Sequence, residues 1–279
     1  MLVSRKKKKY IISLLCHNNL ELTKKCVDSI LKFSGDDYLL VITDNLSTDG
    51  TRNYLTSLEK NPNIHFYFND ANIGYGIPHN EVAYKYINDG KYLVILNNDL
   101  EVCENWLSIM SSAFDTNDDN KVALVGMDKT CNCLDSNGIG YLGPQTEYIE
   151  GSCLMIRADL VKKHGLFSED YKFAYCEDAD MSLRYRELGY ILKQVPLNIK
   201  HHGAATSKLV KNIIDIEGFS VRNHYTLLNK WKAYFKRKNF NYTILIKRAY
   251  AKGDVLLTTP IIRAIRKKWK DCHISIQTG

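Results

Sequence analysis

Apolar runs of strand length alternate with segments of helical periodicity over the first hundred residues. The apolar runs predict buried strands over 10–16, 38–43, 64–68 and 91–96. Apolar residues at helical spacing, or a turn that opens into such spacing, predict helices over 20–33, 48–58 and 77–87. This alternation with short links predicts an α/β fold, with a mostly parallel sheet covered by helices on both faces. Since ligands of such sheets bind at the carboxyl ends of the strands, the residues that follow strands are the first candidates for chemistry.

The pattern is less regular beyond residue 100. It predicts helices over 106–114 and 178–188, and strands over 122–126, 148–157, 190–195 and 197–200. The strand over 148–157 is interrupted at Gly151-Ser152, and the segment 131–148 is rich in Gly, Asn and Asp, which predicts a loop. One long or broken amphipathic helix is expected over 208–236.

A second pattern starts near residue 242, with strands over 243–247 and 273–277 around a loop and a basic helix over 260–269. This is how a second parallel-sheet domain would begin, but the segment is too short to build its own core. We therefore expect a basic tail over 1–9, a main domain over 10–237, and over 238–279 the start of a second domain of a longer parent chain. The apolar face of the basic helix would then pack weakly on 208–236 or associate with another chain.

Composition is that of an ordinary globular protein, with 279 residues, 45% hydrophobic and 25% charged. The apolar runs are much shorter than the roughly 18 residues of a membrane span. The basic N-terminus lacks the long apolar stretch and cleavage site of a signal peptide. Eight scattered cysteines indicate reduced thiols, so we expect a cytoplasmic protein.

The net charge of +7 is unevenly distributed. Residues 1–9 carry +5, and 230–279 carry 13 Lys or Arg against two Asp, which leaves 10–229 with a charge of −9. An acidic middle disfavours nucleic acid as a partner and suits a site that uses carboxylates, with or without a metal. The basic ends suit peripheral contact with anionic lipids at the inner face of a membrane, and equally well solubilising tails.

Two polar clusters follow predicted strands. Asp44 comes directly after the second strand, where its carboxylate can bind a base N–H or a ribose hydroxyl, or else cap a turn. Asp49, five residues on, is expected to cap the next helix. Asn97-Asn98-Asp99 follows the fourth strand and offers oxygen ligands for Mg²⁺ or Mn²⁺, or else forms an Asx-rich turn.

Two further clusters lie in the second half of the chain. Glu177, Asp178 and Asp180 gather at a predicted helix start, after an aromatic stretch. They can serve the helix dipole, but a carboxylate in a partly apolar pocket is also a candidate general base. His201-His202 precedes a glycine after a short strand and can complete a divalent-metal site, although a structural role is the alternative.

In their order and setting, these segments resemble family-2 glycosyltransferases of the GT-A fold over about residues 10–205. The matching segments are Cys16-His17-Asn18, residues 44–51, Asn72-Ile73-Gly74 with Asn80, residues 96–99, residues 150–157, residues 177–180 and His201-His202-Gly203. The sequence departs from the family pattern at the end of the first strand and at Asn97, where an acid is usual. Rhamnosyltransferase-like members share the Asn97 variant. Residues 243–279 resemble instead the start of a heptosyltransferase-like GT-B module.

The resemblance implies an inverting, metal-dependent transfer of a hexose or deoxyhexose from a UDP- or dTDP-sugar. The acceptor would be a hydroxyl of a growing bacterial-type surface glycan or glycolipid, as in polysaccharide biosynthesis. Asp178 would be the catalytic base, and Mn²⁺ or Mg²⁺ would be held by Asp99 with His201 or His202. Donor contacts would come from Cys16, Asn18, Asp44, Asn45, Asn72 and Asn98. The acceptor side would include Gly151, Glu177 and Asp180, the two acids orienting either the acceptor or the helix.

Two other functions compete with this interpretation. A nucleotidyltransferase would carry a Gly-rich, basic loop after the first strand, and 16–20 contains none. A catalytically degenerate module that binds glycan or nucleotide sugar remains the alternative, because Asn97 leaves fewer carboxylate ligands and the second domain is incomplete.

Overall fold

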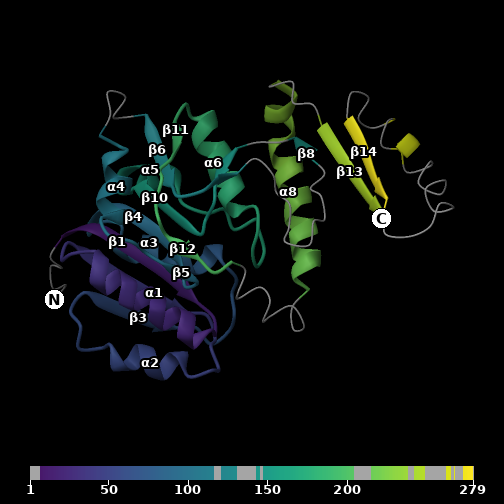
Figure 1. Ribbon diagram of the computed structural model, residues 1–279. Helices are drawn as coiled ribbons and strands as arrows, with labels where there is room; N and C mark the ends of the chain where they lie inside the picture. The colour runs from purple at the N-terminus through teal and green to yellow at the C-terminus, as the bar shows by residue number, and fades with distance from the viewer. Residues whose placement is uncertain are drawn as a thin grey trace.

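The computed structural model describes residues 7–115, 121–130, 143–144, 147–203, 215–237, 242–248, 262–264, 267 and 273–278. A seven-stranded sheet with the order β11-β6-β10-β4-β1-β2-β3 forms its centre (Figure 1). Its strands are β1 (Lys8–Cys16), β2 (Tyr38–Asp44), β3 (Ile64–Phe68), β4 (Gly90–Asn97), β6 (Val122–Gly126), β10 (Cys153–Arg157) and β11 (Ile191–Gln194).

The sheet is mixed but mostly parallel, as the sequence predicts. β1 pairs in parallel with β2 and β4, β2 with β3, and β6 with β11. Only β10, among the seven, runs antiparallel to its neighbours β4 and β6. Every residue of β2, and the middle of β1 and β4, is buried. That explains why these strands appear in the sequence as uninterrupted apolar runs.

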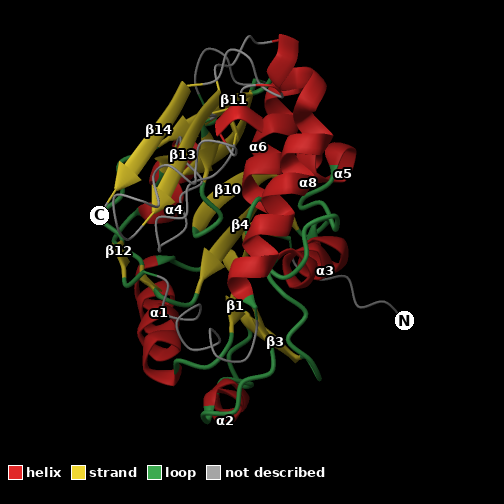
Figure 2. Ribbon diagram, turned by 90° about the vertical axis from the view of Figure 1, so that its right-hand side faces the viewer, coloured by secondary structure: helices red, strands yellow, loops and turns green. Residues whose placement is uncertain are grey.

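Helices cover both faces of the sheet (Figures 1 and 2). They are α1 (Leu20–Phe33), α2 (Thr51–Ser57), α3 (Gly76–Tyr86), α4 (Trp106–Ser112), α5 (Ala158–His164), α6 (Glu177–Glu187) and α8 (Ile216–Arg237). Side chains of α1, α2 and α4 form one core with the sheet, and those of α3, α5 and α6 form the other. A third apolar cluster joins α6 to α8 through Leu183, Leu227 and Phe235. Among the described helices, none combines the length and apolar character needed to cross a membrane.

The structure departs from the predicted elements in three places. α5 was not predicted, because only seven residues separate β10 from the turn at Gly165 and give little periodicity. The strand expected over 197–200 is confined to β12 (Lys200–His201), since its partner β5 (Leu100–Glu101) has only two residues. The loop expected over 131–148 lies mostly outside the described residues, but β8 (Gly143–Pro144) and the start of β9 (Tyr148–Ile149) fall in it, and β9 pairs with β7 (Lys129–Thr130).

The C-terminal strands form a separate small sheet. β13 (Tyr242–Arg248) pairs in parallel with β14 (His273–Thr278), as the predicted β-α-β pattern requires, and its start pairs with β8. α8 lies between the central sheet and this strand pair (Figure 1). The predicted helix over 260–269 is described only at 262–264 and 267, which are helical. The division into domains stays a prediction.

A buried histidine under the sheet gives a first prediction, on the pH dependence of stability. His79 is 1% exposed and its Nδ1 lies 2.7 Å from Ser13 Oγ. Burial lowers the pKa of His79 from 6.5 to about 3. Between pH 6.5 and about 3, His79 is therefore protonated in the unfolded chain but neutral in the folded chain. The free energy of unfolding falls as the pH falls through this range. The expected loss from His79 is about 2 kcal/mol between pH 7 and pH 5.

Urea unfolding of the wild type and of His79→Gln at both pH values measures this loss. The amide of Gln does not titrate, so the variant should lose about 2 kcal/mol less than the wild type on acidification. An identical loss in both proteins would show that His79 is protonated in the fold.

Candidate active site

The predicted donor residues lie at one edge of the sheet. In the parallel register Cys16 is opposite Asp44, and Leu15 is opposite Asn97. The carboxyl ends of β1, β2 and β4 therefore meet side by side, and the polar residues that follow each strand share this edge.

Asp44 is the most buried of these polar groups, at 0% exposure. Its Oδ2 accepts hydrogen bonds from Arg52 Nε at 2.7 Å and from the Ser47 amide at 3.1 Å. Arg52 also donates to the Asn69 carbonyl, so it ties the turn after β2 to the end of β3. The Cys16 thiol packs next to this carboxylate, and burial together with Asp44 raises the pKa of Cys16. Cys16 is therefore a neutral thiol, and Asp44 organises this edge through an ion pair.

The Arg52–Asp44 pair gives a second prediction. Arg52→Met would leave the Asp44 carboxylate buried without its counter-charge, and the free energy of unfolding should fall by about 3 kcal/mol. Arg157→Met is the matched control, because Arg157 pairs with Asp159, whose side chain is largely exposed, and such pairs contribute less than about 1 kcal/mol. Denaturant unfolding compares the two, and equal losses would mean that Asp44 does not depend on Arg52.

The side chain of Asn45 connects the turn after β2 to the segment after β3. Its Nδ2 donates to Asn72 Oδ1 at 2.7 Å and to the Gly74 carbonyl at 2.9 Å. Its Oδ1 accepts from Asn69 Nδ2 and from the Ile73 amide, both at 3.1 Å. The side chain thus shapes the segment 69–74 with all its hydrogen-bonding groups in use.

The turn after β1 is held by side chains of the neighbouring loops. Asn18 Oδ1 accepts from the Thr48 amide at 2.8 Å, and Asn98 Nδ2 donates to the Asn18 carbonyl at 3.3 Å and to Thr23 Oγ1 at 2.9 Å. Asn18 and Asn19 both adopt left-handed backbone conformations, which asparagine tolerates better than most residues.

Asp49 joins two helix starts, as its predicted capping role requires. Its Oδ2 accepts from the Leu20 amide at 2.9 Å, and its Oδ1 accepts from the Thr51 amide at 3.2 Å and from Thr51 Oγ1 at 2.6 Å. These bonds satisfy amides at the starts of α1 and α2.

The pairing of β5 with β12 brings Asp99 to the predicted histidines. His201 Nε2 lies 3.5 Å from Asp99 Oδ1, and the nearby Asp99 carboxylate raises the pKa of His201. The other imidazole turns elsewhere, since His202 Nε2 lies 2.7 Å from Glu101 Oε1 and lowers the pKa of Glu101. The backbone of His202 contacts Asp99 through an N–H···O=C bond of 2.9 Å. Of the two histidines, His201 is therefore the one whose side chain faces Asp99.

The chemistry of this pair fits a divalent cation in part. One carboxylate and one imidazole suit Mn²⁺, and Mg²⁺ is commonly held by one or two carboxylates with substrate phosphates and water. Among the described residues there is no cluster of three or more His, Cys, Asp or Glu side chains able to bind a metal. A cation at Asp99 and His201 would therefore take its other ligands from a bound diphosphate and from water.

Asp178 lies at the start of α6 and is half-buried. Its Oδ2 accepts a hydrogen bond from the Gly151 amide at 3.0 Å, and its Oδ1 accepts from the Ala179 amide at 2.8 Å. Tyr75 donates its hydroxyl proton to the Gly151 carbonyl at 2.6 Å, and a Cβ at Gly151 would lie 2.7 Å from that hydroxyl oxygen. A side chain at position 151 would therefore displace the Tyr75 hydroxyl, and the two amides hold the carboxylate of a residue that is only half-buried.

Backbone contacts connect Asp178 to the Asp99 strand. Ser152, next to Gly151, accepts a hydrogen bond from the Asn97 amide through its carbonyl at 3.0 Å. Burial, and then the charges of Glu177 and Asp178, raise the pKa of Tyr75. Asp178 therefore sits at the same sheet edge as Asp99.

The two acids around Asp178 differ from it in exposure. Glu177 is buried. Asp180 is 0% exposed, and its Oδ1 accepts from Tyr171 Oη at 2.9 Å and from Trp231 Nε1 at 2.8 Å. This favours the helix-orienting role for Asp180 over contact with an acceptor.

Some residues that shape the site carry no signal in the sequence. Arg52 lies two positions beyond Gly50, and only the fold shows that it pairs with Asp44. Glu101 lies four positions beyond Asn97, and only the fold shows that it pairs with His202. Tyr75 follows the Asn72-Ile73-Gly74 motif, so its position next to Gly74 was the one available indication.

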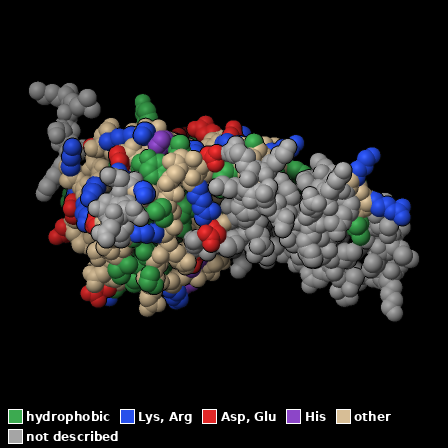
Figure 3. Space-filling view, turned by 90° about the horizontal axis from the view of Figure 1, so that it is seen from above, with side chains coloured by type: hydrophobic (Ala, Val, Ile, Leu, Met, Phe, Trp, Pro, Cys, Tyr) green, Lys and Arg blue, Asp and Glu red, His purple; other side chains and the backbone are tan. Residues whose placement is uncertain are grey.

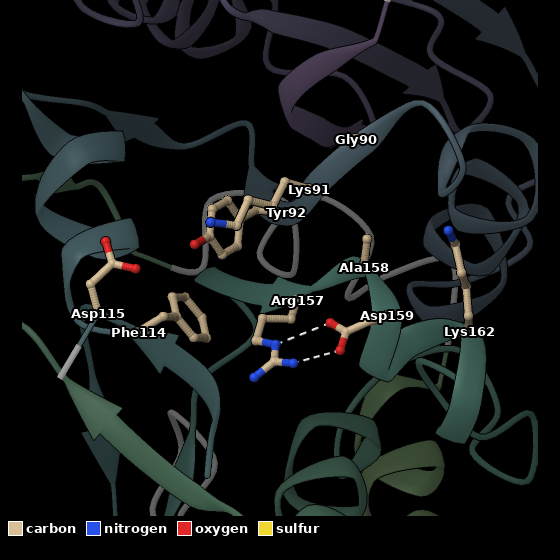
Figure 4. Close-up of a pocket in the computed structure, with 9 residues that line it drawn as sticks. All are labelled: Gly90, Lys91, Tyr92, Phe114, Asp115, Arg157, Ala158, Asp159 and Lys162. Atoms are coloured by element: carbon tan, nitrogen blue, oxygen red, sulfur yellow. Dashed lines mark hydrogen bonds and ion pairs between the residues drawn. The ribbon is translucent and has the colours of Figure 1, made fainter. Parts of the chain in front are cut away.

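A pocket of about 450 Å³ lies at the opposite edge of the sheet, where β4 starts and β10 ends. Tyr92 and Phe114 line it, and Arg157 is turned toward Asp159 with a 3.0 Å bond from Nε to Oδ1 (Figure 4). Tyr92 is five residues from Asn97 along β4, a separation of about 17 Å. The pocket is therefore separate from the candidate site.

Comparison with known proteins identifies the class. The structure resembles that of GalNAc-T7 with UDP, GalNAc and Mn²⁺, with a TM-score of 0.58 and 15% identity, over 69% of this chain and 43% of that one. It also resembles the mannosyltransferase PcManGT from Pyrobaculum calidifontis in complex with GDP-Man and Mn²⁺, with a TM-score of 0.55 and 15% identity, over 95% of this chain and 82% of that one. This chain thus spans less than half of the GalNAc-T7 structure. The fold is that of a GT-A glycosyltransferase.

The family follows from the sequence itself. The model of glycosyl transferase family 2 matches residues 12–165, which is more than half of the chain. A search of curated proteins gave no match. The chain belongs to glycosyl transferase family 2, as its motifs predict.

Proposed function

We propose that the protein is an inverting glycosyltransferase that moves one sugar from a nucleotide-sugar donor to an acceptor hydroxyl. The observation that carries this proposal is the position of Asp178. This half-buried residue has its carboxylate held by two backbone amides, at the sheet edge that also carries Asp99 and His201. The neighbours with UDP or GDP-Man and Mn²⁺ support a nucleotide-sugar donor with a divalent cation.

Asp178 acts as the general base in this proposal. The acceptor oxygen attacks the anomeric carbon while its proton passes to the Asp178 carboxylate, and the bond from that carbon to the diphosphate breaks on the opposite face. The products are a glycoside of inverted configuration, the nucleoside diphosphate and a protonated Asp178, which returns its proton to solvent. Gly151 and Tyr75 keep the carboxylate in place during this step.

Donor binding is assigned to the loops after β1, β2, β3 and β4. Cys16, Asp44 and Asn45 shape the floor for the base and ribose, and Asn18, Asn72 and Asn98 fix the loops around them. Asp99 and His201 would hold Mn²⁺ or Mg²⁺, which supplies positive charge next to the departing diphosphate. His202 would support this site without binding the metal, because its imidazole holds Glu101 and its backbone amide binds the Asp99 carbonyl.

The acceptor is assigned only by class, as a hydroxyl of a bacterial-type surface glycan or glycolipid. Gly151 and Glu177 border the acceptor side of Asp178. Such an acceptor fits a cytoplasmic enzyme with peripheral contact at the inner membrane face through its basic ends. On the face seen from above, however, Lys/Arg and Asp/Glu side chains are interspersed over the described surface (Figure 3).

A panel of nucleotide sugars tests the proposed function. UDP-glucose, UDP-N-acetylglucosamine, a dTDP-hexose and GDP-mannose are each added with Mn²⁺ or with chelator, and both the thermal midpoint and nucleoside diphosphate release are measured. We expect one donor to raise the midpoint in Mn²⁺ and to be slowly hydrolysed, with water in place of the acceptor. Binding without turnover of donor, even with oligosaccharide acceptors, would favour the degenerate binding module.

We also propose that residues after about 238 belong to a second module, whose sequence is similar to the start of a GT-B enzyme. No predicted donor, metal or base residue lies in 238–279, so a chain ending at Arg237 should bind and hydrolyse the donor within about twofold of the full chain. Calorimetric titration with the donor from the panel measures this. Loss of binding on truncation would place part of the donor site in the C-terminal strands.

A further inference from the structure

The amide side chain of Asn223, on α8, binds the backbone of the loop that leads into α6. Asn223 is 2% exposed. Its Nδ2 donates to the carbonyls of Lys172 and Ala174, both at 2.8 Å, and to that of Tyr175 at 3.2 Å. Its Oδ1 accepts from the Lys172 amide at 3.1 Å. One side chain thus binds both ends of a short loop that has no regular secondary structure.

The loop needs such support because its backbone is strained. Phe173, Tyr175 and Cys176 have φ angles of 68°, 81° and 76°, in the left-handed region that favours glycine. Non-glycine residues stay in this region only when their surroundings hold them there, and such residues cluster at functional sites. Cys176 immediately precedes Glu177 and Asp178, and its carbonyl accepts a hydrogen bond from the Asp180 amide at 2.8 Å in the first turn of α6. The geometry of this loop therefore decides where Asp178 is placed.

A second contact holds the loop from the donor side. The Tyr75 amide donates to the Phe173 carbonyl at 2.6 Å, and a Cβ at Gly74 would lie 2.5 Å from that oxygen. The Tyr75 hydroxyl in turn binds Gly151, whose amide binds Asp178. Asn223 and Tyr75 thus hold the loop from two sides, and both lead to the Asp178 carboxylate.

The rest of α8 is anchored independently of Asn223. Trp231 Nε1 donates to Asp180 Oδ1 at 2.8 Å, and Lys230 Nζ lies 2.9 Å from Asp170 Oδ2. Leu227 is fully buried in the cluster between α6 and α8. Removing the Asn223 donors should therefore loosen the loop while α8 stays docked.

We propose that Asn223 is a positioning residue for Asp178, which it fixes by holding the left-handed loop before α6. This proposal rests on the proposed function for its effect on turnover, but the contact itself can be tested without turnover.

Asn223→Asp is the test variant, because it keeps the shape and one acceptor oxygen but loses the donors to three carbonyls. Leu227→Ala, on the same helix, is the matched control, since it weakens the apolar packing between α6 and α8 but removes no hydrogen bond to the loop. kcat and KM are measured for hydrolysis of the donor selected by the panel, together with the thermal midpoint. We expect Asn223→Asp to lower kcat roughly 10- to 100-fold with KM within about twofold, since small misplacements of a reacting group have effects of this order. Leu227→Ala should lower the midpoint at least as much and keep kcat within about threefold.

Hydrogen–deuterium exchange separates this proposal from the proposed function. In Asn223→Asp the amides of 173–178 should exchange faster than in wild type and in Leu227→Ala. Should Asn223→Asp fail to fold, Asn223→Ser, which keeps one donor and one acceptor, takes its place with a smaller effect in the same direction. If the amides of 173–178 exchange faster in Asn223→Asp, but the wild type hydrolyses no donor, the proposed function is overturned and the loop contact is supported. Unchanged exchange in 173–178, or a kcat that follows the thermal midpoint equally in both variants, would overturn the role of Asn223.

Discussion

Asp178→Asn should lower the rate of glycosyl transfer by a factor of roughly 10²–10⁴, because an amide cannot accept the proton of the attacking hydroxyl. The variant keeps the size of the side chain. Its amide group can accept from only one of the two backbone donors that now bind Asp178, those of Gly151 and Ala179. The thermal midpoint should therefore fall slightly while donor affinity stays nearly unchanged, which calorimetry and single-turnover kinetics can measure separately.

Glu177→Gln is the matched control for this prediction. Glu177 is adjacent in sequence and also lies in the first turn of α6, but it is buried. We expect its loss to cost far less activity than that of Asp178. If Glu177→Gln lowers the rate of glycosyl transfer strongly and Asp178→Asn lowers it only slightly, Glu177 is the base.

Asp99→Ala should weaken binding of a nucleoside diphosphate in Mn²⁺ by about 10²-fold, since loss of a metal ligand costs at least as much as loss of its supporting groups. The fold should survive, because Asp99 lies at the sheet edge and its backbone still pairs with His202. Titration calorimetry with UDP, in Mn²⁺ and in chelator, measures the effect.

The two histidines provide the control for the metal prediction. His201→Ala should weaken binding in Mn²⁺, because its Nε2 faces Asp99, whereas His202→Ala should leave it within about threefold, because that imidazole is occupied by Glu101. Equal binding with and without chelator would contradict metal-assisted binding. Equal effects of the two substitutions would contradict the assignment to His201.

The part of the fold that could be predicted is the part governed by local pattern. β2 and β4 are apolar throughout their buried length because both faces are covered, and α1 has a clear apolar face, so their positions follow from sequence periodicity. The same logic placed Asp44 and Asp99 at one sheet edge. It gave no indication of α5, which is too short to show a period, nor that β10 runs antiparallel.

The site could be predicted as a set of residues but not in its detailed roles. Only the two-residue pairing of β5 with β12 distinguishes His201 from His202, and a pairing so short leaves no pattern. The position of Asp44 after a strand suggested a donor contact, yet Arg52, eight residues later, occupies part of its carboxylate. Asn223 lies 45 residues beyond Asp178, and only tertiary packing brings its helix to the catalytic loop.

The central claim is a single displacement on a nucleotide sugar by a hydroxyl that Asp178 deprotonates. The most direct test is real-time proton NMR of donor turnover, which records the anomeric configuration of the first sugar product before it equilibrates. For an α-linked donor such as UDP-glucose or UDP-N-acetylglucosamine, the account predicts that the β-anomer appears first in the wild type, and that Asp178→Asn produces it at least 10²-fold more slowly. First appearance of the α-anomer, or equal rates in the two proteins, would contradict it.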